Sequence, residues 1–143
     1  MKTTYIAVRP IDSKKLETHL NLLNLRYHPI KERRLHVTIL HSDTLTSHYQ
    51  SDPRSHIAHP THYKILTTKT NKACLVLVLD APTLLERHET LKTIHTLTHT
   101  HQEYIPHITI SYDVPQDLDL EGLPIYTGAI TLGEEYIERR SKR

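Results

Sequence analysis

Two short segments combine histidine and threonine at a spacing suited to proton transfer. They read LHVTIL and PHITIS, and both alternate polar with apolar residues. Alternation with a period of two is typical of a β-strand, whose successive side chains lie on opposite faces. His36 and Thr38 are therefore expected to share one face of a strand, and His107, Thr109 and Ser111 one face of another. Two imidazoles and two hydroxyls facing one cleft are the groups needed to cleave a phosphodiester without a metal ion.

The triplet His-x-Thr is weakly specific by itself, because it occurs four times in this chain. The copy at His59 has Pro60 at its centre and falls in an expected loop. The copy at His88 falls inside an expected helix, where residues i and i+2 do not share a face. The copies at His36 and His107 alone have alternating apolar residues around them. The alternative interpretation is a pair of half-buried strand histidines whose polar atoms are satisfied by their neighbours.

Histidine suits acid–base chemistry because its unperturbed pKa lies near neutrality. One neutral imidazole would accept the proton of a ribose 2′-hydroxyl, and the other, protonated, would donate to the leaving 5′-oxygen. A symmetric motif leaves open whether His36 or His107 takes either role. Thr38 and Thr109 would donate hydrogen bonds to the phosphoryl oxygens, as in an oxyanion hole.

Length and composition predict one domain over residues 1–143, with lobes of roughly 1–72 and 73–143. The formal net charge of +2 argues against a protein that coats nucleic acid, so no stable nucleic-acid partner is expected. A single cysteine, Cys74, excludes an internal disulfide and favours a reducing cytoplasm. The longest apolar run is far too short to cross a membrane, and no signal peptide is recognised at the N-terminus.

The order of expected elements contains strand–helix–strand twice. An offset of 71 residues maps His36 onto His107, and it also maps the candidate helix cap Asp12 onto Thr83. Thr83 and Glu86 have the spacing of a capping box. The elements predicted from periodicity and turn residues are strands at 3–9, 35–40, 61–68, 74–80, 106–111, 125–132 and 136–138; helices from 12 or 13 to about 25 and from 82 to about 98; a loop at 41–60; a turn at 70–72; and an irregular segment at 114–123.

The two apolar-flanked His-x-Thr motifs resemble those of the 2H phosphoesterase superfamily. The resemblance extends over nearly the whole chain through the repeated strand–helix–strand layout. It implies an α+β, bilobal, pseudo-symmetric fold, with two antiparallel sheets lining a central cleft and helices outside. It also implies metal-independent cleavage of phosphodiesters, often at a ribose 2′ position.

Within that superfamily the chain is most similar to the phage anti-CBASS phosphodiesterases, which destroy the cyclic oligonucleotide signals of a bacterial defence system. The similarity lies in the compact length, the motif spacing, the early Tyr5 and a glutamate after Gly133. It implies that Tyr5 and Glu135 shape the substrate site, with Glu134 as the alternative to Glu135. An aromatic residue that stacks on a base would correspond to Tyr63.

The resulting hypothesis is an enzyme that converts cyclic di- or oligonucleotides to linear products, with no cofactor and no metal. Two alternatives stay open: a 2H enzyme acting on RNA 2′,3′-cyclic ends or 2′–5′ linkages, and a sponge that binds the signal without cutting it. The histidine-rich stretch of His56, His59 and His62 is expected to lie on the surface without binding a metal.

Overall fold

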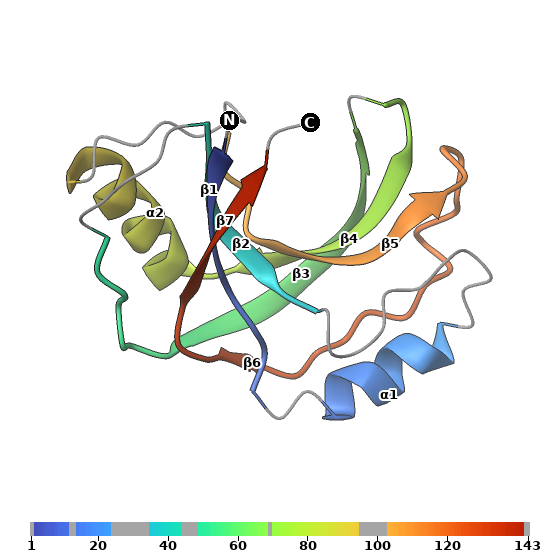
Figure 1. Ribbon diagram of the computed structural model, residues 1–143. Helices are drawn as coiled ribbons and strands as arrows, with labels where there is room; N and C mark the ends of the chain where they lie inside the picture. Colours follow the sequence, from blue (N-terminus) through green and yellow to red (C-terminus); the bar gives the residue numbers. More distant parts are fainter. Residues whose placement is uncertain are drawn as a thin grey trace.

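A curled antiparallel sheet of seven strands is the framework of the protein (Figure 1). The computed structural model describes residues 2–11, 14–23, 35–43, 49–68, 70–94 and 103–141. In chain order the elements are β1 (Lys2–Val8), α1 (Lys14–Leu22), β2 (Val37–Ser42), β3 (His56–Thr67), β4 (Ala73–Asp80), α2 (Pro82–Ile94), β5 (His107–Val114), β6 (Ile130–Leu132) and β7 (Tyr136–Ser141). The strand order is β6-β3-β4-β5-β2-β1-β7, which is compatible with the α+β class predicted from the sequence.

The main hydrophobic core lies between the sheet and the helices, which lie outside the curl (Figure 1). The expected apolar faces of the helices are confirmed where the structure describes them. Leu16 and Leu23 are buried at the first helix, and Leu84 and Leu91 at the second. The expected helix ends at 12, 13, 25 and 98 lie outside the described residues. The other face of the sheet, on the inside of the curl, is therefore the face that the helices do not cover.

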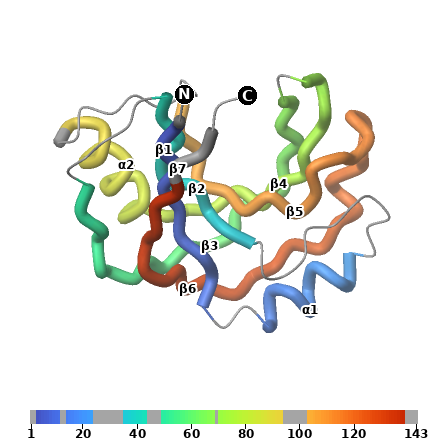
Figure 2. Tube along the Cα trace, in the orientation of Figure 1, coloured from blue at the N-terminus to red at the C-terminus, as the bar shows by residue number. Residues whose placement is uncertain are grey.

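The two halves of the sheet meet at the strands that carry the histidine motifs. β2 and β5 pair antiparallel through Val37 and Ile108. Because of this pairing the strand order is continuous, and one sheet stands where the sequence led us to expect two. In one half of the sheet β3 pairs with β4. In the other half β7 pairs with β1, so the last strand of the chain lies beside the first (Figure 2).

The largest differences from the predicted strands lie at the start of β3 and in β6, and β5 and β7 also end three residues later than expected, at Val114 and Ser141. β3 begins at His56 although a loop was expected as far as Pro60. Pro60 is accommodated because the register with β4 shifts between Pro60 and His62, and a residue without an N–H is tolerated at such irregularities. The strand expected at 125–132 is restricted to Ile130–Leu132, which pairs with the first residues of β3.

The expected turn between β3 and β4 is confirmed. Asn71 has φ 65°, a left-handed conformation that asparagine adopts more readily than most residues. The N–H of Asn71 donates to the carbonyl of Thr68 at 2.9 Å, which closes the turn. No helix in the described residues is long and apolar enough to span a membrane.

Candidate active site

The pairing of β2 with β5 brings the two histidine motifs together. With Val37 opposite Ile108, the antiparallel register puts His36 level with Thr109, and Thr38 level with His107. Cross-strand neighbours have Cβ atoms roughly 5 Å apart, and diagonal neighbours roughly 7–8 Å. Each histidine therefore lies beside the threonine of the other motif, and the two imidazoles are diagonal neighbours. The sequence predicted the motifs singly, and the tertiary structure combines them on one surface.

Burial confirms the expected orientation of the two histidines and the two threonines, whereas Ser111, which was expected on the face of His107 and Thr109, is fully buried. Val37 is fully buried and Ile108 likewise, and both belong to the core that the helices cover. His36, Thr38, His107 and Thr109 are all partly exposed. The four side chains consequently lie on the face opposite the helices, anchored by apolar residues behind them.

A backbone carbonyl fixes the orientation of the His107 ring. Nδ1 of His107 lies 2.7 Å from the carbonyl oxygen of Ile105, so this nitrogen carries the proton and donates. In the neutral ring the lone pair is then on Nε2. His107 is therefore held in the tautomer that a general base at Nε2 requires.

Tyr5 of β1 joins the first motif, as the sequence suggested. Its hydroxyl lies 2.7 Å from Nε2 of His36 and 2.5 Å from Oγ1 of Thr38. The ring of Tyr5 also makes edge contacts with the rings of His36 and His41, at centroid separations of 5.9 and 5.7 Å. The Tyr5 hydroxyl carries one proton, so it can donate to only one of these two atoms at a time, and it links the His36 ring to the Thr38 hydroxyl.

Two residues that the sequence did not indicate hold the backbone of the first motif. The Tyr104 hydroxyl donates to the carbonyl of Thr38 at 2.7 Å, and Nδ1 of His88 donates to the carbonyl of Ile39 at 2.7 Å. The rings of Tyr104 and His88 stack at 4.1 Å with an interplanar angle of 8°. Burial raises the pKa of Tyr104, with a further contribution from Tyr5. Tyr104 precedes the second motif, so it ties one motif to the other.

The sequence contained a partial signal for only one of this pair. His88 belongs to a His-x-Thr triplet, but its helical position made the triplet uninformative as a strand motif. Tyr104 lies three residues before His107, and no spacing rule connects it to Thr38. The contact arises from the pairing of β2 with β5, which brings these segments together.

Tyr63 is not brought to the group around the histidines in any described contact. It is 7 % exposed and packs within the main core that the helices cover. Its hydroxyl donates to the carbonyl of Pro124 at 2.9 Å, and burial raises its pKa to about 12. Stacking on a ligand base stays a sequence-based prediction for Tyr63, and the described packing of this ring gives it no support.

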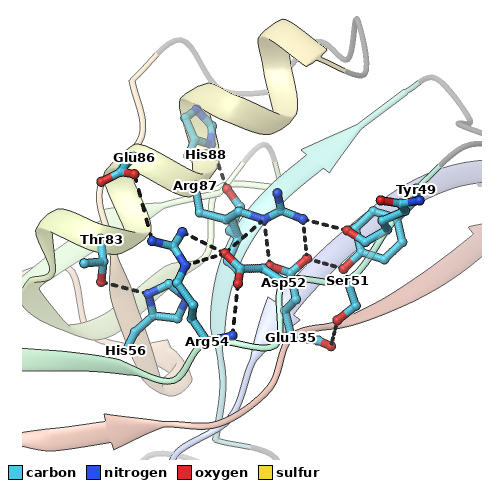
Figure 3. A network of polar contacts seen from close by, with 12 residues as sticks. Tyr49, Ser51, Asp52, Arg54, His56, Thr83, Glu86, Arg87, His88 and Glu135 are labelled. Carbon is cyan, nitrogen blue, oxygen red and sulfur yellow. Dashed lines mark hydrogen bonds and ion pairs between the residues drawn. The ribbon is translucent and has the colours of Figure 1, made fainter.

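Glu135 lies in a buried ion-pair network next to α2 (Figure 3). Its carboxylate accepts hydrogen bonds from Nε and Nη2 of Arg87, at 2.8 and 3.0 Å, and from the Tyr49 hydroxyl. The Glu135 side chain is fully buried and that of Arg87 is 10 % exposed. Burial acts to lower the pKa of Arg87, but the hydrogen bonds and charge of Glu135 outweigh it and raise that pKa. The alternative, Glu134, is exposed.

The same network extends to the start of β3. Asp52 lies 4.0 Å from Arg87 and accepts from Arg54, whose hydrogen bond lowers the Asp52 pKa. His56 is 1 % exposed, so the expectation of a surface position is wrong for this residue. Nδ1 of His56 contacts Oγ1 of Thr83 at 2.7 Å, a hydroxyl that was expected to cap α2. In the described residues no group of three or more histidine, cysteine, aspartate or glutamate side chains is placed to hold a metal ion.

The chain is thus an antiparallel α+β protein with two neighbouring histidine–threonine pairs on the open face of its sheet. The family model of "Anti-CBASS protein Acb1" matches residues 2–141. The chain belongs to the Acb1 family of anti-CBASS proteins.

Individual relatives agree with this assignment. The chain is 30 % identical over 139 residues to the Anti-CBASS protein Acb1 of Vibrio phage KVP40, covering 94 % of this chain and 85 % of the relative. It is 33 % identical over 86 residues to that of Enterobacteria phage T4, covering 60 % of this chain and 55 % of the relative. A protein of the same name from Sphingomonas paeninsulae is 33 % identical over 109 residues, which are 71 % of this chain and 17 % of the relative.

Proposed function

We propose that the protein is a phosphodiesterase that opens cyclic di- or oligonucleotides to linear products and so counters a CBASS-type antiviral defence of bacteria. The observation that carries this function is the pairing of Val37 with Ile108, which combines two imidazoles and two hydroxyls on one face. Membership in the Acb1 family supports the role against CBASS. The 2H type of chemistry is inferred from the motifs themselves.

The proposed reaction is an in-line attack by a ribose 2′-oxygen on the adjacent phosphorus. One neutral histidine accepts the 2′-hydroxyl proton while the bond from that oxygen to phosphorus forms. The bond to the 5′-oxygen breaks, and the other histidine, protonated, supplies the proton that the leaving oxygen needs. The first product is a linear nucleotide ending in a 2′,3′-cyclic phosphate, with the same mass as the substrate. Water can open that phosphate in a second step with the histidine roles exchanged.

Thr38 and Thr109 are proposed to donate to the phosphoryl oxygens, where negative charge gathers in the transition state. Each threonine lies level with the histidine of the other motif, which favours contact with a phosphate held between the imidazoles. Tyr5 is proposed to position His36 and Thr38 for this task, through its two hydrogen bonds. Each hydroxyl supplies less than a proton-transfer group does, because its donation can be replaced in part by water.

A bilobal, pseudo-symmetric 2H arrangement is part of the proposal. An antiparallel strand pair has a local two-fold axis at its centre, and here that axis would pass between Val37 and Ile108. On either side the strand order continues with one strand that precedes a helix, followed by β7 on the β2 side and by β3 and β6 on the β5 side. Such symmetry suits a substrate that presents similar groups on both sides of the cleaved phosphate.

Chromatography with mass spectrometry tests the proposed function. The purified protein is incubated with a panel of cyclic di- and trinucleotides in excess EDTA, and the histidine-deficient variant His107→Ala serves as the matched control. We expect a product that has the mass of the substrate but a different retention time, formed by the parent and not by His107→Ala. Intact ligand recovered on heating would indicate a sponge, and activity confined to RNA 2′,3′-cyclic ends or 2′–5′ linkages would indicate the RNA-directed alternative. Activity lost in EDTA and restored by zinc would overturn the metal-independent reaction.

A further inference from the structure

Each motif strand carries a β-bulge immediately after its threonine. In β2, Ile6 of the neighbouring strand pairs with Leu40 and Ala7 with Thr38, so Ile39 is an extra residue. In β5, Leu75 pairs with Ser111 and Val76 with Thr109, which leaves Ile110 as the extra residue. The two bulges are therefore at equivalent positions of the motifs, separated by the same 71 residues as the histidines.

The bulges change which residues reach the open face. Without a bulge, the side chains of Leu40 and Ser111 would share the face of the threonines. Instead the extra residue and the one after it both face the core, because Ile39, Leu40 and Ile110 belong to the main core cluster and Ser111 pairs with Leu75 of that cluster. A bulge shifts the alternation by one residue and turns the next side chain to the opposite face.

The shift returns His41, which pairs with Tyr5, to the open face, and Tyr112 follows Ser111 at a second register shift, between Ala73 and Leu75, where Cys74 of β4 lies opposite. His41 lies 5.7 Å from the Tyr5 ring, beside the first motif, as the shift requires. Tyr112 is 52 % exposed and is the single aromatic side chain among the exposed large hydrophobic residues of the described chain. Both follow their threonine by three residues, roughly 10 Å along a strand.

The surface next to Tyr112 is apolar at its base. Val76 and Val78 pair with Thr109 and His107, so they share the open face of β4 and β5. Together with Cys74 they form a cluster separate from the main core, against which Leu66 and Ile105 pack. The Cys74 thiol is 3.7 Å from the backbone carbonyl of Tyr112. Cys74, Val76 and Val78 are themselves buried, so a flat apolar ligand held at the second motif would meet the partly buried Leu66 or Ile105 and the exposed ring of Tyr112.

We infer that Tyr112 stacks on a nucleobase of the substrate, one nucleotide away from the phosphate held at Thr109. This role rests on the proposed function, which places the phosphate between the motifs. His41 occupies the equivalent position on the other half and faces the flanking nucleotide. Bases stack well on tyrosine, and each such contact is worth about 1–3 kcal/mol. Tyr112 is therefore expected to set affinity and base preference, and to leave proton transfer unaffected.

Titration calorimetry and steady-state cleavage of cyclic dinucleotides with purine or pyrimidine bases test this inference. Tyr112→Ala is compared with the parent, with Tyr112→Phe, and with Leu85→Ala as a control at an exposed apolar residue of α2. We expect Kd and KM to rise about 5- to 150-fold in Tyr112→Ala, which is the stacking energy converted at 1.36 kcal/mol per tenfold. The loss should be larger for purines, with kcat within about twofold of the parent. Tyr112→Phe and Leu85→Ala should bind as the parent does.

The outcomes separate this inference from the proposed function. Unchanged Kd and KM in Tyr112→Ala would overturn the stacking role and leave the phosphodiesterase intact. Binding without cleavage by the parent would overturn the phosphodiesterase, and the Kd of Tyr112→Ala would still decide the stacking role. A parent that binds none of the panel would overturn both.

Discussion

Replacement of Glu135 by glutamine separates a structural role from ligand contact. Glutamine keeps the shape of the side chain but removes its charge, so the Arg87 guanidinium loses the carboxylate that balances it. Breaking a buried ion pair at one partner costs about 3–5 kcal/mol. Asp52 stays 4.0 Å from Arg87 and balances part of the charge. We therefore expect the lower end of the range, about 3 kcal/mol of unfolding free energy.

This loss converts directly into a melting temperature. The unfolding entropy is about 2.1 cal/mol/K per residue, or about 0.3 kcal/mol/K for a chain of 143 residues. A loss of about 3 kcal/mol should therefore lower Tm by about 10 °C. The assay is calorimetric or circular-dichroism melting of the parent, Glu135→Gln and the exposed neighbour Glu134→Gln. The neighbour should melt within about 2 °C of the parent, because exposed substitutions usually change stability by less than about 0.5 kcal/mol.

A double replacement strengthens the test. Arg87→Met combined with Glu135→Leu removes both charges, and buried ion pairs can be exchanged for apolar residues with little loss. The double variant should therefore melt above the temperature expected from the sum of the single losses. The reasoning would be refuted if Glu135→Gln melted with the parent yet no longer bound cyclic nucleotides. That result would place the carboxylate in contact with the ligand, as the sequence suggested.

Three further results are expected. Both His36→Ala and His107→Ala should lower kcat at least about a hundredfold while Tm stays near that of the parent, and turnover at the parental rate by either would contradict the acid–base assignment. Tyr104→Phe removes the hydrogen bond to the Thr38 carbonyl and should lower kcat roughly fivefold with little change in KM, because a lost hydrogen bond is worth about 1 kcal/mol. A kcat and KM equal to those of the parent would show that Tyr104 does not position the first motif. Burial lowers the pKa of His56 and His88 in the folded protein, so the unfolded chain binds more protons at acid pH. The free energy of unfolding should therefore fall as pH drops below about 6.5, and His56→Asn should lessen this decline. Equal Tm values at pH 7.5 and 5.5 would contradict the expectation.

The sequence alone determined the local parts of the site. Period-two alternation was sufficient to place Val37 and Ile108 in the core and the histidines and threonines on the other face, since side-chain direction in a strand depends only on local geometry. The same holds for the buried leucines of the helices and for the turn at Asn71. Tyr5 was indicated by the family resemblance and not by local periodicity.

Only the tertiary structure decided how these parts meet. The pairing of Val37 with Ile108 joins segments 71 residues apart, and no local periodicity fixes such a register. Glu135 and its partner Arg87 are likewise 48 residues apart in the sequence. The bulges that expose Tyr112 arise from the count of residues on neighbouring strands, which a single strand does not reveal. The residue types of the two motifs follow from the sequence, and so does the face on which each side chain lies. Their position next to each other depends on strand pairing, whose register is specified by hydrophobic burial on the far face of the sheet.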